Sequence, residues 1–167
     1  MRRAEAGFAA AGVLFAAAWL WSLGRLPERV PTHFGTGGAA DAWSSRTVAL
    51  ATFGGIGLGT ALLFAGLVWF VGRVPAAHVD VPNPGYWKQP EHLGRLRRLL
   101  AEDMWWLGAA TLLLLAVVQV LVVRAAAMAD PGLGPEGPAA VGSYLLVVLG
   151  RTVWMFTRRY AVPQAAT

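Results

Sequence analysis

Long apolar runs alternate with polar intervals along the whole chain. The runs cover residues 7–23, 47–71, 104–123 and 139–156, and their lengths range from 17 to 25 residues. A helix of about 20 apolar residues is long enough to cross the hydrocarbon core of a bilayer. The pattern therefore predicts an all-α integral membrane protein with four transmembrane helices, folded as a single domain over residues 1–167.

Polar residues inside the last two runs leave alternatives open. The fourth run would have only 12 residues if it stopped at Gly150, whereas it has 18 if it continues to Phe156. Arg151 is therefore expected inside the helix near its end, where its side chain either snorkels to the headgroups or faces the bundle as a buried charge. Gln119 in the third run is expected to form a hydrogen bond across helices.

The first run has a second interpretation as a cleaved signal peptide. Arg2 and Arg3 would be its charged start, and the alanines in the middle of the run would mark the cleavage site. Trp19 and Trp21 extend the apolar run beyond that site, and they suit an aromatic belt at the membrane interface better than a mature N-terminus. We therefore expect this run to remain as a span.

Composition supports a membrane location and changes the expected partners. Apolar residues make up 56% of the chain, charged residues only 14%, and the mean hydropathy is +0.52. In an ordinary soluble domain, about a quarter of the residues are charged. The net charge is +5, and the charged residues lie beside the apolar runs. This position favours anionic lipid headgroups over nucleic acid as the partner. Gly55 and Gly59 in the second run predict close helix packing and make a homo-oligomer a reasonable expectation.

The intervals between the runs differ in character. In the loop at residues 26–46, Pro27 and Pro31 predict an extended entry, and Gly35, Gly37 and Gly38 predict a turn that permits positive φ. Ser44 and Ser45 are expected to supply the N-cap of the next helix. Residues 72–103 form a connection that is irregular at first and helical from about Pro90. The leucines of this helical part share one face and its arginines supply charge. We therefore expect a short amphipathic helix that lies along the membrane surface before the third span.

The distribution of basic residues predicts the topology. Four spans place both termini on one side together with residues 72–103. That side carries nine Lys and Arg residues and the other side carries four. The first set is Arg2, Arg3, Arg73, Lys88, Arg95, Arg97, Arg98, Arg158 and Arg159, and the second is Arg25, Arg29, Arg46 and Arg124. The positive-inside rule therefore predicts a multi-pass protein of the plasma membrane with cytoplasmic termini, an external loop at 26–46 and a cytoplasmic connection at 72–103.

Candidate chemistry is sparse. His33 and Asp41 share one loop, which makes them candidates for metal ligands. They are weak candidates, because the other two histidines, His78 and His92, are expected on the opposite side of the membrane and cannot complete the site. Zinc usually takes three or four protein ligands, so a hydrogen bond from His33 to a loop carbonyl and a capping role for Asp41 are the favoured interpretation. No catalytic motif is present, and no cofactor is expected. All acidic residues lie outside the predicted spans, so a proton-relay transporter lacks its usual acid.

Two groups of residues resemble a known bacterial membrane module. The first is the string Leu26, Pro27, Glu28, Arg29, Val30, Pro31, Thr32, His33 and Phe34, followed by Gly38, Asp41 and Trp43. It resembles the domain of unknown function 1648 (DUF1648), whose pattern is roughly L-P-x-x-[IV]-P-x-H-F and then G-x-x-D, over about residues 12 to 65. The second group, Asn83, Pro84, Tyr86 and Trp87, resembles the N-x-x-Y-W string that often follows this module in relatives.

The resemblance implies a function at the cell membrane. The module opens SdpI-type immunity and signal-transduction proteins, which protect a producer cell from its own secreted toxin and signal its presence. The resemblance thus implies a non-enzymatic membrane protein that senses, or gives immunity to, an extracellular or envelope ligand such as a peptide or protein. The residues expected to recognise this ligand are Pro31, His33, Phe34, Asp41 and Trp43, and the expected cytoplasmic motif comprises Asn83, Pro84, Tyr86 and Trp87.

Two other functions remain open from the residues alone. Gln119 and Arg151 inside the spans are compatible with a small transporter or with an accessory subunit of a membrane complex. His33 and Asp41 are compatible with a metal-dependent envelope enzyme, although they supply only two ligands. Neither alternative has a sequence motif of its own, so SdpI-like sensing or immunity is the leading prediction.

Overall fold

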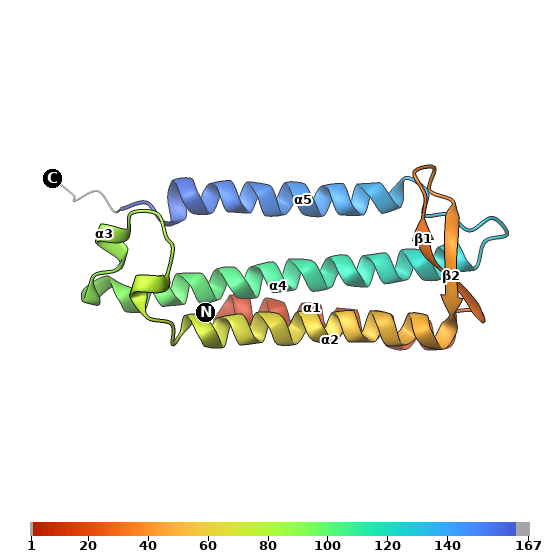
Figure 1. The fold of residues 1–167 in the computed structure, drawn as a ribbon, viewed down its shortest axis with the longest axis horizontal. Helices are drawn as coiled ribbons and strands as arrows, with labels where there is room; N and C mark the ends of the chain where they lie inside the picture. The colour runs from red at the N-terminus through yellow and green to blue at the C-terminus, as the bar shows by residue number, and fades with distance from the viewer. Residues whose placement is uncertain (1, 163–167) are drawn as a thin grey trace.

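Four long helices run side by side in the computed structural model, which describes residues 2–162 (Figure 1). They are α1 (Arg2–Leu23), α2 (Arg46–Val71), α4 (Pro90–Ala126) and α5 (Glu136–Trp154), and a π-helical turn at Met155–Arg159 continues α5. All four are long and apolar enough to cross a membrane. The predicted class, an all-α membrane protein with four spans, is confirmed. Met1 and residues 163–167 of the predicted domain lie outside the described part.

The longest helix, α4, forms the centre of the arrangement. Helices α1 and α2 pack against it on one side, and α5 lies along the other side (Figure 1). The close approach of three helices depends on Gly108 of α4, because a β-carbon there would lie 2.7 Å from the Phe8 ring of α1 and 2.8 Å from the Phe64 ring of α2. Helix packing in a membrane uses such small residues to bring backbones together.

Close contact between α1 and α2 uses a different glycine from the predicted pair. A β-carbon at Gly57 would collide with the Phe15 ring, whereas Gly55 and Gly59 have open space around them. The prediction that Gly55 and Gly59 mediate packing was therefore wrong for contacts within this chain. The reason is rotational: spacing alone places two glycines on one helix face, but it does not say which face meets the neighbour.

Residues 26–46, predicted as a loop with an extended entry and a glycine turn, fold into a β-hairpin whose strand pairing the sequence did not predict. Strands β1 (Arg29–Phe34) and β2 (Ala40–Ser45) pair antiparallel, with Val30 opposite Ser44. The register shifts between Pro31, which has no N–H to donate to the ladder, and His33, and again between His33 and Phe34. The turn closes through a hydrogen bond from Gly35 N to Ala39 O of 2.9 Å, and Gly38 supplies the positive φ of 79°. This small sheet does not alter the fold class.

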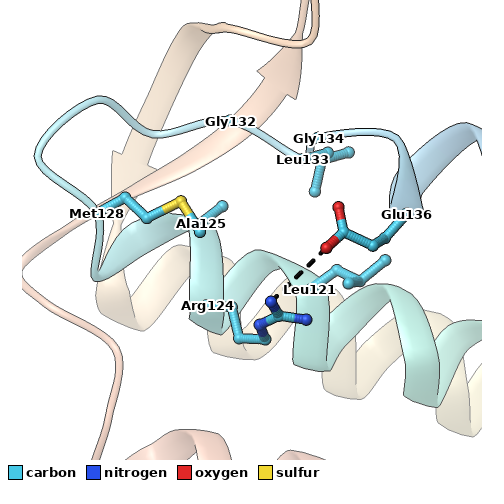
Figure 2. Close-up of a pocket in the computed structure, with 8 residues that line it drawn as sticks. All are labelled: Leu121, Arg124, Ala125, Met128, Gly132, Leu133, Gly134 and Glu136. Carbon is cyan, nitrogen blue, oxygen red and sulfur yellow. Dashed lines mark ion pairs between the residues drawn. The ribbon is translucent and has the colours of Figure 1, made fainter.

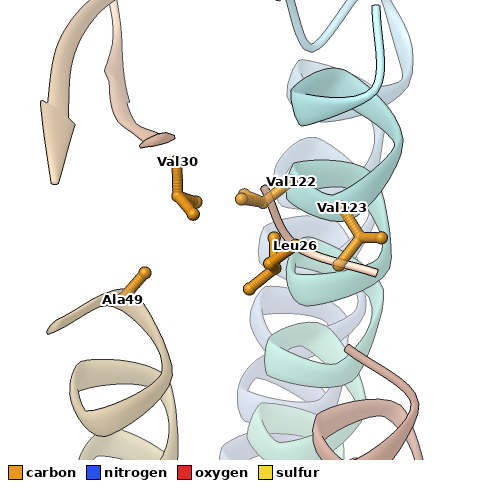
Figure 3. Packing of buried hydrophobic residues seen from close by; sticks show 5 residues of the cluster. All are labelled: Leu26, Val30, Ala49, Val122 and Val123. Carbon is orange, nitrogen blue, oxygen red and sulfur yellow. The ribbon is translucent and has the colours of Figure 1, made fainter. Parts of the chain in front are cut away.

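The hairpin is anchored to the helices by an apolar cluster. Val30 of β1 points toward Val122 and Val123 at the end of α4, with Ala49 of α2 and Leu26 beside them (Figure 3). Val30 is completely buried, and the other four are nearly so. The cluster is the reason that a two-stranded ribbon, which is marginal alone, is held in one place.

The connection after α2 contains a short 3₁₀ turn (Ala76–His78) and the one-turn helix α3 (Pro84–Trp87) before α4 begins. The predicted helix start at Pro90 is confirmed. The predicted separate surface helix is absent from the described residues, because α4 continues without a break for 37 residues, a length of about 55 Å. Its leucine face meets protein instead of lipid: Leu96 is fully buried in a cluster with Trp87 and Tyr160.

The molecule has two distinct ends. The hairpin end carries β1, β2 and the loop at 127–135, whereas the termini end carries the start of α1, the connection at 72–89 and the end of α5 (Figure 1). Tyr160 packs against the connection at 72–89, so it also lies at the termini end. An even number of antiparallel spans requires that both termini share one end. The hydrocarbon core of a bilayer is about 30 Å thick, so part of α4 extends beyond it.

Candidate functional site

The hairpin brings together the five residues expected to recognise a ligand. His33 Nδ1 lies 2.5 Å from Asp41 Oδ1, and both side chains are more than half exposed. This direct pair replaces the predicted bond from His33 to a loop carbonyl and the predicted capping role of Asp41. The cap of α2 is Ser45, whose hydroxyl accepts from Val48 N at 3.3 Å, as expected for a serine there.

The other three expected ligand-recognition residues, Pro31, Phe34 and Trp43, differ in exposure. Pro31 is fully buried, and Phe34 packs against the anchoring cluster. Trp43 is 40% exposed, with the Arg29 guanidinium 5.7 Å from its ring centroid. The hairpin thus presents a polar and aromatic outer surface formed by His33, Asp41 and Trp43, while Pro31 and Phe34 hold it on the helices.

An apolar groove lies under the hairpin between α2 and α4. Its volume is about 450 Å³, and its lining includes Phe34, Val48, Phe53, Ile56, Val118 and Leu133. Ligand sites are commonly hollows of this size with apolar walls and a few polar groups. The groove suits an apolar side chain or an acyl chain, because most of its lining is aliphatic or aromatic.

A second, smaller hollow of about 250 Å³ lies beside the loop that joins α4 to α5 (Figure 2). Arg124 and Glu136 form an ion pair across it at 3.7 Å, and both are about half exposed. The same loop is tied to the hairpin turn by hydrogen bonds from Ala40 N to Pro131 O at 3.0 Å and from Leu133 N to Gly38 O at 3.2 Å. Hairpin and loop therefore form one unit.

A metal site does not assemble around the predicted candidates. In residues 2–162 no group of three or more His, Cys, Asp and Glu side chains is close enough to hold an ion. His33 and Asp41 have each other, and His92 is at the termini end, where it stacks on Tyr86 with ring centroids 3.9 Å apart. The hypothesis of a metal-dependent enzyme is left with the same two ligands that the sequence offered.

The termini end contains a buried charge cluster that sequence reasoning missed. Asp103 of α4 is 2% exposed, and its carboxylate accepts from Arg151 Nη2 at 2.7 Å, Arg159 Nε at 3.0 Å and the Tyr160 hydroxyl at 2.7 Å. Arg159 also donates to Glu102 at 2.8 Å. The sequence held one available signal: Asp103 directly precedes the third apolar run, at the membrane level that Arg151 reaches from the fourth.

Arg151 therefore faces the bundle, which decides between the two alternatives for this residue. Its guanidinium carbon lies 4.5 Å from the Trp154 ring centroid and 5.1 Å from that of Trp106, in addition to its bond with Asp103. A buried charge in a membrane protein is normally paired in this way.

Tyr160 connects this cluster to the predicted cytoplasmic motif. Burial raises the pKa of the Tyr160 hydroxyl, and its bond to the Asp103 carboxylate raises it further, so the hydroxyl remains a donor. The Tyr160 carbonyl accepts from Asn83 Nδ2 at 3.0 Å and from Trp87 Nε1 at 2.9 Å. Pro84 begins α3 and so positions Trp87, which is 1% exposed. The motif therefore holds the chain after α5 through Asn83 and Trp87.

Gln119 forms the predicted hydrogen bond across helices. Its Nε2 donates to the Ser22 hydroxyl of α1 at 2.8 Å, and both side chains are completely buried. The Ser22 hydroxyl donates in turn to Trp19 O at 2.7 Å. This contact belongs to the packing of α1 on α4, because it lies in the interface between these two helices.

Comparison with known proteins bears on the hairpin segment. Neither the curated proteins nor the solved structures contain a match to this chain. Residues 11–58 match a family model, and they run from α1 through the hairpin into α2. The match confirms the resemblance noted from the sequence motif. The family is described as domain of unknown function (DUF1648), and the segment at residues 11–58 is the module of that family in this chain.

Proposed function

We propose that this protein is a non-enzymatic membrane protein of the SdpI-like type, in which the hairpin end recognises an envelope or extracellular ligand. The observation that carries the proposal is the hairpin itself: the DUF1648 motif residues fold into one anchored unit with an apolar groove beneath it. Such a unit offers a preformed surface, and preformed sites lose less entropy on binding.

The ligand is an amphipathic, membrane-active peptide. The groove would take apolar side chains, while His33, Asp41 and Trp43 at the outer surface would contact polar groups. The resemblance to SdpI-type proteins supports a peptide, because those proteins act against a secreted toxin. A peptide that partitions into the headgroup layer would meet the hairpin end first if this end is external, as the positive-inside rule predicts.

Ligand binding in the groove changes the termini end through a movement of α4. The same continuous helix contributes Val122 and Val123 to the hairpin cluster and Asp103 to the charge cluster. A shift or rotation of α4 would alter the bonds that Asp103 makes to Arg159 and Tyr160. The arrangement of the chain after α5 would then report the ligand to a cytoplasmic partner.

Protection of cells tests this proposal. Susceptible bacteria that express the chain should survive higher concentrations of cationic membrane-active peptides than cells with an empty vector. Phe34→Ala should abolish the gain, because Phe34 lines the groove, whereas Phe156→Ala should retain it, because that side chain is 62% exposed near the opposite end. Membrane insertion of both variants is checked by detergent extraction and size-exclusion chromatography. Equal survival with and without the chain for every peptide would contradict the proposal.

Thiol labelling tests the proposed sides of the membrane. The chain has no cysteine, so one introduced cysteine is the only attachment site. Gly37 in the hairpin turn and Gly85 in α3 both have open space for a side chain. In intact cells an impermeant maleimide should label Gly37→Cys and should leave Gly85→Cys unlabelled until the membrane is permeabilised. The reverse pattern would place the groove on the cytoplasmic side.

A transporter or accessory subunit remains a second candidate because of Asp103. This buried acid beside Arg151 supplies the ionisable pair that the sequence interpretation did not find inside the bundle. Proteoliposomes containing the wild type or Arg151→Ala separate the two candidates. Solute or proton flux in the wild type that the variant loses would support transport, and absence of flux in both would remove it.

A further inference from the structure

A hollow lined by arginines lies at the termini end, beside the charge cluster. Its volume is about 540 Å³. Three separate parts of the chain line it. These are the start of α1 with Arg2 and Arg3, the middle of α4 with Glu102 and Trp106, and α5 with the turn that continues it, with Arg151 and Arg159. Four basic side chains thus converge from positions that are distant in the sequence.

The charges around the hollow do not cancel. Arg151 and Arg159 are paired with the carboxylates of Asp103 and Glu102. Arg2 and Arg3 are exposed, and no ion pair is formed by either of them within the part of the chain that the structure describes. The hollow therefore carries an excess of positive charge, which attracts an anion.

Arg151, which lines the hollow, also has a buried donor that lacks an acceptor. Arg151 Nε is enclosed by protein and has no hydrogen-bond partner among residues 2–162. A buried N–H without an acceptor is costly, and natural structures rarely retain one without an explanation such as a bound group. The arginine fork is well suited to phosphate oxygens.

The depth of the hollow in the membrane identifies the source of the anion. Trp106 and Trp154 flank Arg151, and Trp105 contacts Phe8 with ring centroids 4.7 Å apart. Tryptophans gather at the level of the lipid headgroups. Along α5, apolar side chains such as Leu146 and Val153 are exposed and would face acyl chains. A phosphate in the hollow would be at the correct level to belong to a lipid.

We propose that this hollow is a specific binding site for the phosphate group of an anionic phospholipid. Arg151, whose side chain is 24% exposed, supplies a guanidinium at the wall of the hollow, and Arg2 and Arg3 supply the surplus charge. The site differs from the general attraction of anionic lipids to the basic connection at 72–103, because its residues come from α1 and α5. It does not depend on the proposed recognition of a peptide at the hairpin end.

Native mass spectrometry of the full chain tests the site. The protein is released from micelles that contain equal amounts of phosphatidylglycerol and phosphatidylcholine with identical acyl chains, and the retained lipids are counted. The wild type should retain phosphatidylglycerol in preference. The variant Arg2→Gln with Arg3→Gln should reduce this preference by about 30-fold, because each arginine near the surface contributes a factor of about five. It leaves the bonds of Asp103 intact.

A matched control separates a site from overall charge. Arg25→Gln with Arg46→Gln removes the same two charges at the hairpin end, where both residues are exposed. This variant should retain the wild-type preference. An equal loss in the two double variants would overturn the proposal, as would a wild type with no preference for phosphatidylglycerol.

Inorganic phosphate distinguishes a lipid from a soluble anion. Added phosphate at millimolar concentration should displace little phosphatidylglycerol, because the lipid is also held by its acyl chains. Complete displacement, with loss of phosphate binding in the Arg2 and Arg3 double variant, would assign the site to a free anion and overturn the lipid proposal.

Discussion

The two ends of the molecule each contain a carboxylate paired with a cationic or ionisable partner, but in opposite environments. Asp41 meets His33 on the outside of the hairpin, where both side chains are more than half exposed. Asp103 meets Arg151 and Arg159 inside the bundle, where its own side chain is 1% exposed. An exposed pair contributes about 0 to 1 kcal/mol, whereas breaking a buried pair costs about 3 to 5 kcal/mol. Breaking the pair at the hairpin end should therefore cost little stability, whereas breaking the pair at the termini end should destabilise the bundle.

The largest expected effect comes from Asp103→Asn. The change leaves the largely buried Arg151 without a countercharge and Arg159 with Glu102 alone, so we expect a loss of about 3 to 5 kcal/mol in the free energy of unfolding. Thermal unfolding in detergent, followed by circular dichroism, measures it. Asp41→Asn is the matched control and should change stability by about 1 kcal/mol or less. Similar losses in the two variants would break the comparison between the ends.

A smaller effect is expected from Trp87→Phe. The substitution removes the indole N–H that Tyr160 O accepts at 2.9 Å and leaves the carbonyl with one donor, Asn83. Because the carbonyl keeps one partner, we expect a loss of about 0.5 to 1.5 kcal/mol. Hydrogen exchange of residues 159–162, measured by mass spectrometry, should become faster while that of the hairpin stays unchanged. Trp43→Phe, at an exposed position of the hairpin, is the control and should leave exchange at the termini end as it was.

His33→Ala should separate function from stability. Because the pair with Asp41 is exposed, its loss should lower the free energy of unfolding by about 1 kcal/mol or less. Protection against membrane-active peptides should fall to the level of cells without the chain. His78→Ala is the control, since His78 is exposed at the other end. A fully protective His33→Ala would show that the outer surface of the hairpin does not contact the ligand.

The smallest effect concerns pH at Tyr160. Its pKa is raised in the folded protein, so its contribution to stability is fully present below the unfolded value of about 10 and falls as pH rises beyond that value. The difference in melting temperature between the wild type and Tyr160→Phe should therefore stay constant from about pH 6 to about pH 9. A difference that shrinks within this window would mean that the hydroxyl is not held by Asp103.

Local signals predicted the parts of the fold that depend on neighbours in the sequence. Pro90 as a helix start and Ser45 as an N-cap are both correct, because each acts within one turn of its own helix. The hairpin was missed, since prolines and glycines dominate the segment and Val30 is the only β-branched residue of β1 that the cluster buries. The cluster of Leu26, Val30, Ala49, Val122 and Val123, and not strand propensity, stabilises it.

The sequence by itself determined the number of spans, the helical class and the presence of the DUF1648 module. Each of these depends on a contiguous stretch: a run long enough to cross a bilayer, or a motif within one segment. Only the tertiary structure decided that Asp103, Arg151, Arg159 and Tyr160 meet, that Trp87 holds Tyr160, and that Gly57 and not Gly55 faces α1. These contacts depend on the rotation and vertical position of each helix against its neighbour, which many side chains set together and no single stretch records.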